Sequence, residues 1–364
     1  MIHNKKRGGG KMTVIEFKTD PIASFFSLWS YGLTELSNPT TERKITFSKL
    51  LNSYQSQSIP KLQKTFPSFK DKSDEEKKGY IESFKQITHN VNNACYDSSE
   101  KLINDMVSMF HLSESEKEIL TNAYSSYQKF YELNKSNIIK SRSAITNTYK
   151  EQGVYDYLKK MYSFFQINES QKANAYLHHY PNVLMDTGKS EGNTIHQNIS
   201  LTKNEDENNY LKNSCILNRR MFTPIHELGH FLFGKSNSAQ DVLKNSNTAA
   251  HQVFQQLKNY FSLKSNKPET YAYACIHEAF ASSCSCFFQA QKKPTFDPLK
   301  MKNLNSNFKE ADALTRIFYP IYQQFLKSNN TISDDFFKKV LNDPAFQQNF
   351  KQPPKLSAKS SERD

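Results

Sequence analysis

The segment His226-Glu227-Leu228-Gly229-His230 has the residue types and the spacing of a metal-dependent hydrolytic site. An α-helix makes one turn in about 3.6 residues, so two histidines four positions apart lie on one face and can bind the same metal ion. Glu227 follows the first histidine directly, where its carboxylate can reach a water bound to that metal. The pattern therefore predicts a metal site in which Glu227 is the general base.

The residues around this motif predict a buried helix. Thr223 suits the N-cap position and Pro224 suits the first helical position, while Gly234 stands where a glycine often ends a helix. The residues between them are apolar nearly all round, which is typical of a helix inside a core. Burial favours metal binding, because an imidazole that is removed from water needs a partner.

A catalytic zinc ion commonly has three protein ligands and one open position. His230 is followed by Phe-Leu-Phe-Gly-Lys-Ser, which lacks the third histidine of the metzincins and excludes that class. The best candidate is Glu278, 48 residues later, which stands among Ala, Cys, Ile and Phe, where an unpaired carboxylate is costly to bury. Its neighbour His277 is also a competent ligand. Neighbours on a helix point about 100° apart, so only one of the two can face the metal, and we favour Glu278.

The motif at 226–230, combined with Glu278 in the later run His-Glu-Ala-Phe-Ala, resembles the gluzincin zinc metallopeptidases over roughly residues 190–290. The resemblance implies a zincin catalytic core with Zn²⁺ held by His226, His230 and Glu278. It also implies that Glu227 is the general base and that the substrate is a peptide or protein. An endopeptidase is slightly preferred over an aminopeptidase, since no feature indicates recognition of a free N-terminus.

Peptide hydrolysis also needs a donor for the oxyanion. Arg316 and Tyr319 are three residues apart and share a helix face, a spacing similar to the oxyanion pair of the clostridial neurotoxin light chains, which are also gluzincins. Tyr271, Tyr273 and His277 are alternatives. The chain contains 19 Tyr, so an ordinary packing tyrosine is the simpler interpretation of each of them.

Composition and charge bear on the other function classes. The 364 residues include 13% aromatic residues, enough for a real core despite a mean hydropathy of −0.73. The net charge of +12 is spread over scattered lysines and is interrupted by acidic runs at 74–76 and 205–207, so no nucleic-acid partner is expected. The alternative functions are a non-proteolytic zinc-binding protein with a structural or vestigial site, and a basic surface-binding protein. The intact Glu227 argues against a purely structural site.

Cysteine usage and the N-terminus bear on the compartment. The five cysteines form no C-x-x-C pair and their number is odd, which favours reduced, mostly buried thiols and a cytoplasmic protein. The basic N-terminus is not followed by an apolar stretch of about 7–15 residues, so no cleavable signal peptide is expected. We therefore expect a cytoplasmic protein, or an effector exported without such a signal, and no membrane span.

The expected fold class is mainly α with a small β-sheet (α+β), a gluzincin-like core and a helical N-terminal half. We expect mobile tails at 1–18 and 351–364, a helical N-terminal region at 19–168 and the metallopeptidase catalytic region at 169–350.

Capping boxes and apolar spacing predict the elements. Capping boxes are expected at Ser73–Glu76, Ser113–Glu116 and Asp97–Glu100. Short strands are expected at 173–180 and 194–201, separated by a loop that contains Gly and Asp. A Ser/Asn-rich connection and a series of helices should follow the metal helix, the connection at 235–247 and the helices at about 248–262, 269–291, 308–328 and 333–342.

The strand region carries further histidines. Adjacent residues on a strand point to opposite faces, so we expect one of His178 and His179 to be exposed and the other packed. His196 is expected to be an ordinary packed histidine. We hypothesise that the strand at 194–201 lines the cleft and pairs with an extended substrate, and that the polar loop at 202–213 could act as a lid.

Overall fold

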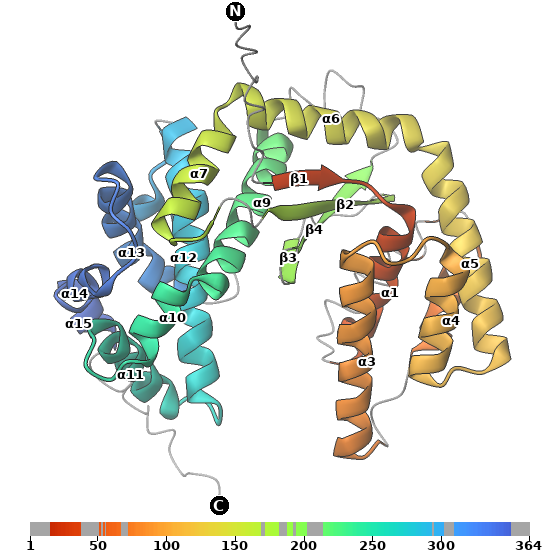
Figure 1. Cartoon of the computed structure of the whole chain (residues 1–364), viewed down its shortest axis with the longest axis horizontal. Helices are drawn as coiled ribbons and strands as arrows, with labels where there is room; N and C mark the ends of the chain where they lie inside the picture. Colours follow the sequence, from red (N-terminus) through yellow and green to blue (C-terminus); the bar gives the residue numbers. More distant parts are fainter. Residues whose placement is uncertain are drawn as a thin grey trace, which may run out of the picture. The chain divides into compact units, whose positions relative to one another are not determined.

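The computed structural model describes residues 15–37, 51, 54, 56–66, 72–168, 172–181, 188–191, 194–201, 214–292, 295–301 and 309–350. The described chain is mostly helical with one small sheet (Figure 1), which confirms the predicted mainly α, α+β class. Predictions for most of the N-terminal tail, for the polar loop and for the C-terminal tail lie outside the described residues. None of the described helices is both long enough and apolar enough to cross a membrane.

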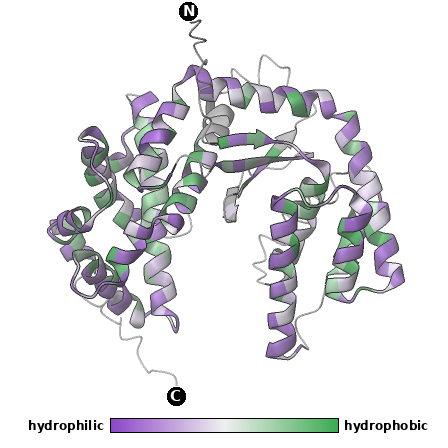
Figure 2. Ribbon diagram, in the orientation of Figure 1, coloured by the Kyte–Doolittle hydropathy of each residue, from purple (hydrophilic) through white to green (hydrophobic). Residues whose placement is uncertain are grey.

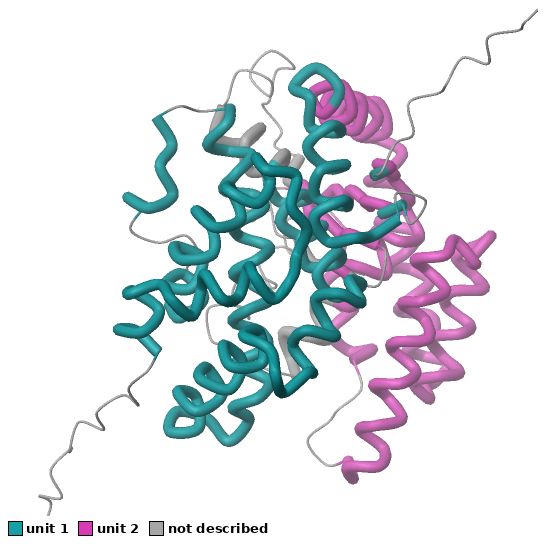
Figure 3. Tube along the Cα trace, turned by 60° about the vertical axis from the view of Figure 1, so that its left-hand side comes forward, with its two compact units in different colours: residues 1–15, 150–173, 222–364 teal, residues 16–149, 174–221 magenta. Residues whose placement is uncertain are grey.

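The chain divides into two compact units that alternate along the sequence (Figure 3). Unit 1 comprises Met1–Ile15, Lys150–Ala173 and Phe222–Asp364, and unit 2 comprises Glu16–Tyr149 and Asn174–Met221. The whole HExxH motif and Glu278 belong to unit 1. The contiguous functional regions expected from the sequence, with their boundary at residue 168, stay a prediction.

Unit 2 contains a helical core and nearly all of the sheet. Hydrophobic residues recur along its helices (Figure 2) and are buried at helical spacing. Its elements are β1 (Ile15–Lys18), α1 (Pro21–Ser37), η1 (Pro60–Thr65), α3 (Asp74–Asn92), α4 (Ser99–Phe110), α5 (Glu114–Leu133), most of α6 (Lys135–Glu151), β2 (Ala173–Pro181), β3 (Gly188–Glu191) and β4 (Thr194–Leu201).

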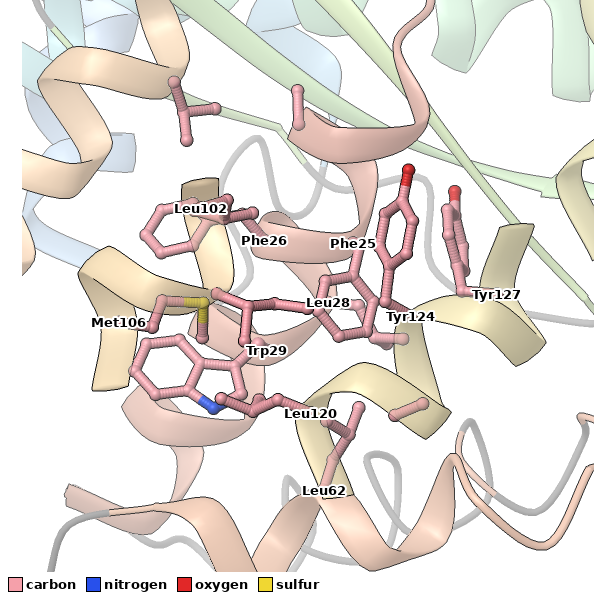
Figure 4. Close-up of a cluster of buried hydrophobic side chains, with 14 of the residues drawn as sticks. Phe25, Phe26, Leu28, Trp29, Leu62, Leu102, Met106, Leu120, Tyr124 and Tyr127 are labelled. Carbon is pink, nitrogen blue, oxygen red and sulfur yellow. The ribbon is translucent and has the colours of Figure 1, made fainter. Parts of the chain in front are cut away.

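The helical core of unit 2 is organised around Trp29 of α1, the single tryptophan of the chain. Its ring is fully buried beside the ring of Phe26 (Figure 4), and it also contacts the ring of Phe110. The indole nitrogen donates a hydrogen bond of 3.0 Å to Thr65 Oγ1, whose hydroxyl donates to the carbonyl of Leu62. The buried polar end of the tryptophan is therefore satisfied within the core.

The sheet has the order β1-β2-β4-β3. β2 and β4 are parallel, and β3 is antiparallel to β4, pairing Gly188 with Gln197 and Glu191 with Thr194. β3 occupies part of the expected Gly- and Asp-containing loop, a strand that the sequence did not predict. The first half of β4 is paired on both sides, so the hypothesis that this strand accepts a substrate strand is wrong over 194–197.

The histidines of β2 are both buried, so the prediction that one of them would be exposed is wrong. Both faces of this interior strand are covered, since every residue from Ala175 to Tyr180 is buried. His178 Nδ1 lies 3.0 Å from Ser24 Oγ, and His178 Nε2 lies 2.8 Å from Nδ1 of His196. His196 is packed, as expected.

Unit 1 is built around the long helix α12. Phe280, at its centre, contacts the rings of Phe233, Phe318 and Phe336 from three neighbouring helices, with centroids 4.8–5.1 Å apart. The helix that carries Glu278 is therefore fixed from several sides. The elements are α7 (Val154–Phe164), α9 (Ser214–Lys235, whose first residues belong to unit 2), α10 (Asn237–Lys244), α11 (Ala249–Ser262), α12 (Pro268–Lys292), η2 (Pro298–Lys300), α13 (Lys309–Lys327), α14 (Asp334–Leu341) and α15 (Pro344–Phe350).

Two further segments differ from the sequence-based expectation. Residues 15–18 form β1, with Ile15 and Phe17 buried, where a mobile tail was expected. Residues 237–244 form α10, where only a connection was expected. Ser236 starts this helix because its side chain accepts a hydrogen bond from the backbone of Ala239.

The cysteines of α12 agree with the prediction of reduced, buried thiols. Cys275, Cys284 and Cys286 are free and buried, whereas Cys95 is free and exposed. Burial raises the pKa of Cys284 to about 12, so its thiol stays protonated and acts as a small apolar side chain.

The helix starts in unit 2 confirm two of the three predicted capping boxes. Ser73 and Ser113 form both bonds of the box with the glutamates three residues later. The third box is wrong, because α4 begins at Ser99 and its N-cap is Ser98 instead of Asp97. The Ser98 hydroxyl accepts a bond of 3.3 Å from the backbone nitrogen of Lys101.

We expect Ser98→Ala to lower the free energy of unfolding by about 1 kcal/mol, because it removes the acceptor for a backbone N–H at the helix start. Asp97→Ala is the matched control at the neighbouring exposed position and should change it by less than about 0.5 kcal/mol. Urea denaturation of the two variants measures both values. A larger loss of unfolding free energy for Asp97→Ala than for Ser98→Ala would contradict the N-cap at Ser98.

Candidate metal centre

The HExxH motif lies inside a longer helix than the sequence predicts. α9 begins at Ser214, so Thr223 is not its N-cap and Pro224 lies within it. Proline fits the first helical position well, and that preference suggested the wrong start. The predicted end at Gly234 agrees with the observed last residue, Lys235. His226 therefore lies about three turns into the helix, away from the partial positive charge of the helix start.

Three side chains from α9 and α12 converge on one point. His226 Nε2 lies 3.1 Å from Glu278 Oε1, and His230 Nε2 lies 3.2 Å from Glu278 Oε2. The two Nε2 atoms are 3.1 Å apart. These residues form the one group in the described part of the chain whose His, Cys, Asp or Glu ligand atoms could together hold a metal ion.

The separations fit the ligand shell of a zinc ion. Zn–N and Zn–O distances of about 2.0–2.2 Å and tetrahedral geometry place two ligand atoms about 3.3 Å apart. The three observed separations of 3.1–3.2 Å are close to that value. Two imidazoles and one carboxylate also form the donor set of a common class of catalytic zinc sites. The residues present therefore fit a zinc ion by both distance and chemistry.

Electrostatics also favours a positive charge at this point. Burial alone would raise the pKa of the Glu278 carboxyl, but the imidazoles of His226 and His230 beside it hold that pKa well below its usual range. Burial alone would lower the pKa of His226, but the Glu278 carboxylate raises it. The cluster thus contains an ionised carboxylate whose nearest partners are nitrogen atoms, and a proton or a metal ion can occupy the space between them.

Glu227 adds a second carboxylate beside this cluster. It is 8% exposed, and its charge contributes to the raised pKa of His226. It is not one of the three clustered ligand residues. The arrangement therefore places one carboxylate among the clustered ligand atoms and a second carboxylate on the residue next to His226.

His277, the other ligand considered for the third position, is directed at His230 itself. Its Nδ1 lies 2.9 Å from His230 Nδ1, and its Nε2 lies 3.0 Å from the carbonyl oxygen of His230. Burial, and then the neighbouring His230, lower the pKa of His277 to about 4. The structure thus places Glu278, and not His277, at the Nε2 atoms of both motif histidines.

The two helices approach closely where Gly229 of α9 meets Ala281 of α12. A Cβ atom at position 229 would lie 2.8 Å from the Cα of Ala281, closer than real Cβ contacts come. Sequence reasoning did not identify this contact. The available signal was a glycine inside an apolar helix, a position where alanine would form helix better and where a close backbone approach is the usual reason for glycine.

Three of the oxyanion candidates, Arg316, Tyr319 and Tyr271, also belong to unit 1. The Arg316 guanidinium donates to the carbonyl oxygens of Leu299 and Met301, so it holds the segment around η2. Tyr319 is buried, and burial raises its pKa. Tyr271 is 47% exposed, with its ring against Phe261. Arg316 thus has a structural role at this segment, and the oxyanion role considered from the sequence stays a prediction.

No protein-family model, curated protein or solved structure matches this chain.

We expect Gly229→Ala to destabilise the protein by about 1–3 kcal/mol, because the methyl group would meet backbone atoms of α12. The gain in helix propensity, at most about 1 kcal/mol, is smaller. Gly79→Ala in α3 is the matched control, since a Cβ there meets nothing within 4 Å, and it should stabilise the protein slightly. Thermal unfolding of both variants tests the sign, and a stabilised Gly229→Ala would contradict the close approach.

The pH dependence of the metal-free protein follows from the two pKa shifts. The raised pKa of His226 means that its contribution to stability is complete below its usual pKa of 6.5 and is lost as the pH rises through the raised value. The lowered pKa of Glu278 means that its contribution is complete above its usual pKa of 4.5 and is lost only as the pH falls through the lowered value. We therefore expect the excess stability of the wild type over Glu278→Gln to be largest at about pH 5–6.

Urea denaturation in the presence of a chelator, at a series of pH values, measures this difference. It should reach about 1–3 kcal/mol and should decrease toward pH 8. With saturating zinc the trend should reverse, since the ligands must lose their protons to bind the metal. A metal-free difference that grows steadily from pH 5 to pH 8 would contradict the His226–Glu278 ion pair.

Proposed function

We propose that this protein is a zinc-dependent peptidase of the gluzincin type. The observation that carries the proposal is the convergence of His226, His230 and Glu278 at mutual separations of 3.1–3.2 Å, with Glu227 beside them but outside the ligand set. A peptide or protein is the proposed substrate, and endopeptidase activity is preferred. A cytoplasmic site of action, or export without a cleavable signal, remains part of the same proposal.

The chain's own residues have distinct roles in this proposal. His226, His230 and Glu278 hold the zinc ion, which when bound lowers the pKa of a water molecule and polarises the scissile carbonyl. Glu227 accepts the proton of the attacking water and later transfers it to the leaving amine. Its position supports this role, because it follows the first ligand histidine directly, where its carboxylate can reach a water bound to the metal.

The composition of the site favours a catalytic zinc over a structural zinc. Structural sites are usually closed by four protein ligands, commonly cysteine and histidine. In the described part of the chain the cluster has three protein ligands, and the buried cysteines of α12 are not among them. In the proposed site water takes the fourth position, and the proposed general base Glu227 stands next to a ligand.

Metal analysis combined with one activity assay tests the proposal. The wild type should bind close to one zinc per chain, and His230→Ala and Glu278→Ala should lose it, because each removes one of three ligands. Glu227→Gln should keep the zinc and cleave at least about 100-fold more slowly, because it removes only the general base. Zinc is measured by elemental analysis, and cleavage by mass spectrometry of a peptide pool from a digested proteome.

Glu269→Gln is the matched control for these variants. Glu269 is an exposed acid in the first turn of α12 that pairs with Lys258, so its loss should change neither zinc content nor cleavage. A wild type that binds no zinc after reconstitution would refute the proposal. A zinc-loaded wild type that cleaves nothing would favour the non-proteolytic alternative, and equal cleavage by Glu227→Gln would refute the role of the base.

A further inference from the structure

The side chain of His277 uses both of its ring nitrogens on a single residue, His230. One nitrogen contacts the backbone carbonyl oxygen of His230 at 3.0 Å, and the other contacts the Nδ1 atom of the His230 ring at 2.9 Å. The two rings are 4.5 Å apart and tilted by 31°. His277 is therefore in a position to control the proton on the one His230 nitrogen that does not face the metal centre.

The chemistry of the two contacts determines where the protons lie. A carbonyl oxygen can only accept, so His277 Nε2 carries a proton and donates it. A neutral imidazole has one such proton, which leaves His277 Nδ1 as an acceptor. The proton in the second contact must then be on His230 Nδ1. A neutral His230 with its proton on Nδ1 has a lone pair on Nε2, the atom that lies 3.2 Å from Glu278 Oε2.

Aromatic packing fixes the ring of His277 in this position. The ring of Phe233 lies against it with a centroid distance of 5.3 Å, and the ring of Tyr273 stacks on it at 5.6 Å. Gln240 donates hydrogen bonds to the Tyr273 hydroxyl and to the carbonyl of Phe233, which joins the two aromatic neighbours. A Cβ at Gly234 would lie 3.8 Å from His277 Nε2, so the chain also passes close to the donating edge of the ring.

We propose that His277 is a positioning residue which holds His230 in the tautomer with its proton on Nδ1, so that the Nε2 lone pair of His230 is directed at the metal. This inference rests on the proposed zinc site and assigns a task to a residue that does not itself bind the ion. Metal-binding histidines usually have such a partner for their second nitrogen, most often a carboxylate or a carbonyl. In this chain a second histidine takes that role, and its own proton is committed to the backbone of the residue that it positions.

The contact has a clear consequence for the metal-free protein. Without His277, the proton of His230 can move to Nε2 and be donated to Glu278 Oε2, which lies 3.2 Å away. Zinc would then have to displace this proton in addition to the one that His226 shares with Glu278. Loss of such a partner typically weakens metal binding by about 10- to 100-fold.

Nitrogen NMR of the metal-free wild type, with labelled histidine, tests the tautomer directly. His230 is assigned by the cross-peaks that disappear in His230→Gln. We expect the wild-type His230 ring to carry a proton on Nδ1. A ring protonated on Nε2 alone would overturn the proposal, whatever the protein does with zinc.

Zinc affinity, measured by competition with a chelating dye, provides the second test. His277→Phe keeps the ring shape and removes both polar contacts, so it should bind zinc about 10- to 100-fold more weakly and move the His230 proton to Nε2. In His277→Gln one amide can accept from Nδ1 of His230 and donate to its carbonyl, so this variant should recover affinity relative to His277→Phe. His251→Phe is the matched control, because His251 also bonds a backbone carbonyl from a helix of unit 1, and it should bind zinc like the wild type.

The outcomes separate this inference from the peptidase proposal. If the wild type binds zinc and His277→Phe binds it equally well, the positioning role is refuted and the peptidase proposal stands. If the wild type binds no zinc, the peptidase proposal fails, and the NMR measurement still decides the His230 tautomer. If both His277 variants lose affinity equally and keep the His230 proton on Nδ1, His277 acts only through packing and the inference is wrong.

Discussion

The backbones of α9 and α12 meet at Gly229 and Ala281, and the candidate metal centre depends on that approach. One turn away from the contact on α12 lies Glu278, and the two motif histidines flank Gly229 on α9. Ligand atoms can come within 3.1–3.2 Å of one another only if the helices that carry them are held at one separation. The aromatic packing around Phe280 maintains that separation, so the apolar core of unit 1 sets the geometry of its most polar cluster.

Burying that cluster costs free energy in a metal-free protein. Two carboxylates and three imidazoles are gathered inside an apolar helix pair, and their hydrogen bonds and ion pairs offset only part of the cost of removing them from water. The opposite pKa shifts of Glu278 and His226 show how the protein lowers that cost, by placing a proton where a cation would lie. Groups whose pKa values are strongly shifted in this way are concentrated at functional sites, where stability is given up for chemistry.

The sequence was sufficient for the parts of the site that depend on helical periodicity. Spacing alone places His226 and His230 on one face, and the isolation of Glu278 among apolar residues identifies it as their partner. The start of α9 could not be predicted, because Pro224 fits a helix start so well that its place inside a longer helix leaves no local signal. The burial of both histidines of β2 was also unpredictable, since it depends on coverage of two sheet faces by distant segments.

The centre is built from two His-Glu pairs, one on each helix, used in opposite ways. In α9 the histidine of the pair His226-Glu227 faces the cluster and the glutamate stands beside it. In α12 the glutamate of the pair His277-Glu278 faces the cluster and the histidine turns to His230. Since neighbours on a helix point about 100° apart, each pair can supply only one ligand. In the proposed site the other member of each pair has a supporting task, proton transfer by Glu227 and orientation of His230 by His277. A choice between His277 and Glu278 as ligand is therefore a question about the rotation of α12, which the contact at Ala281 decides.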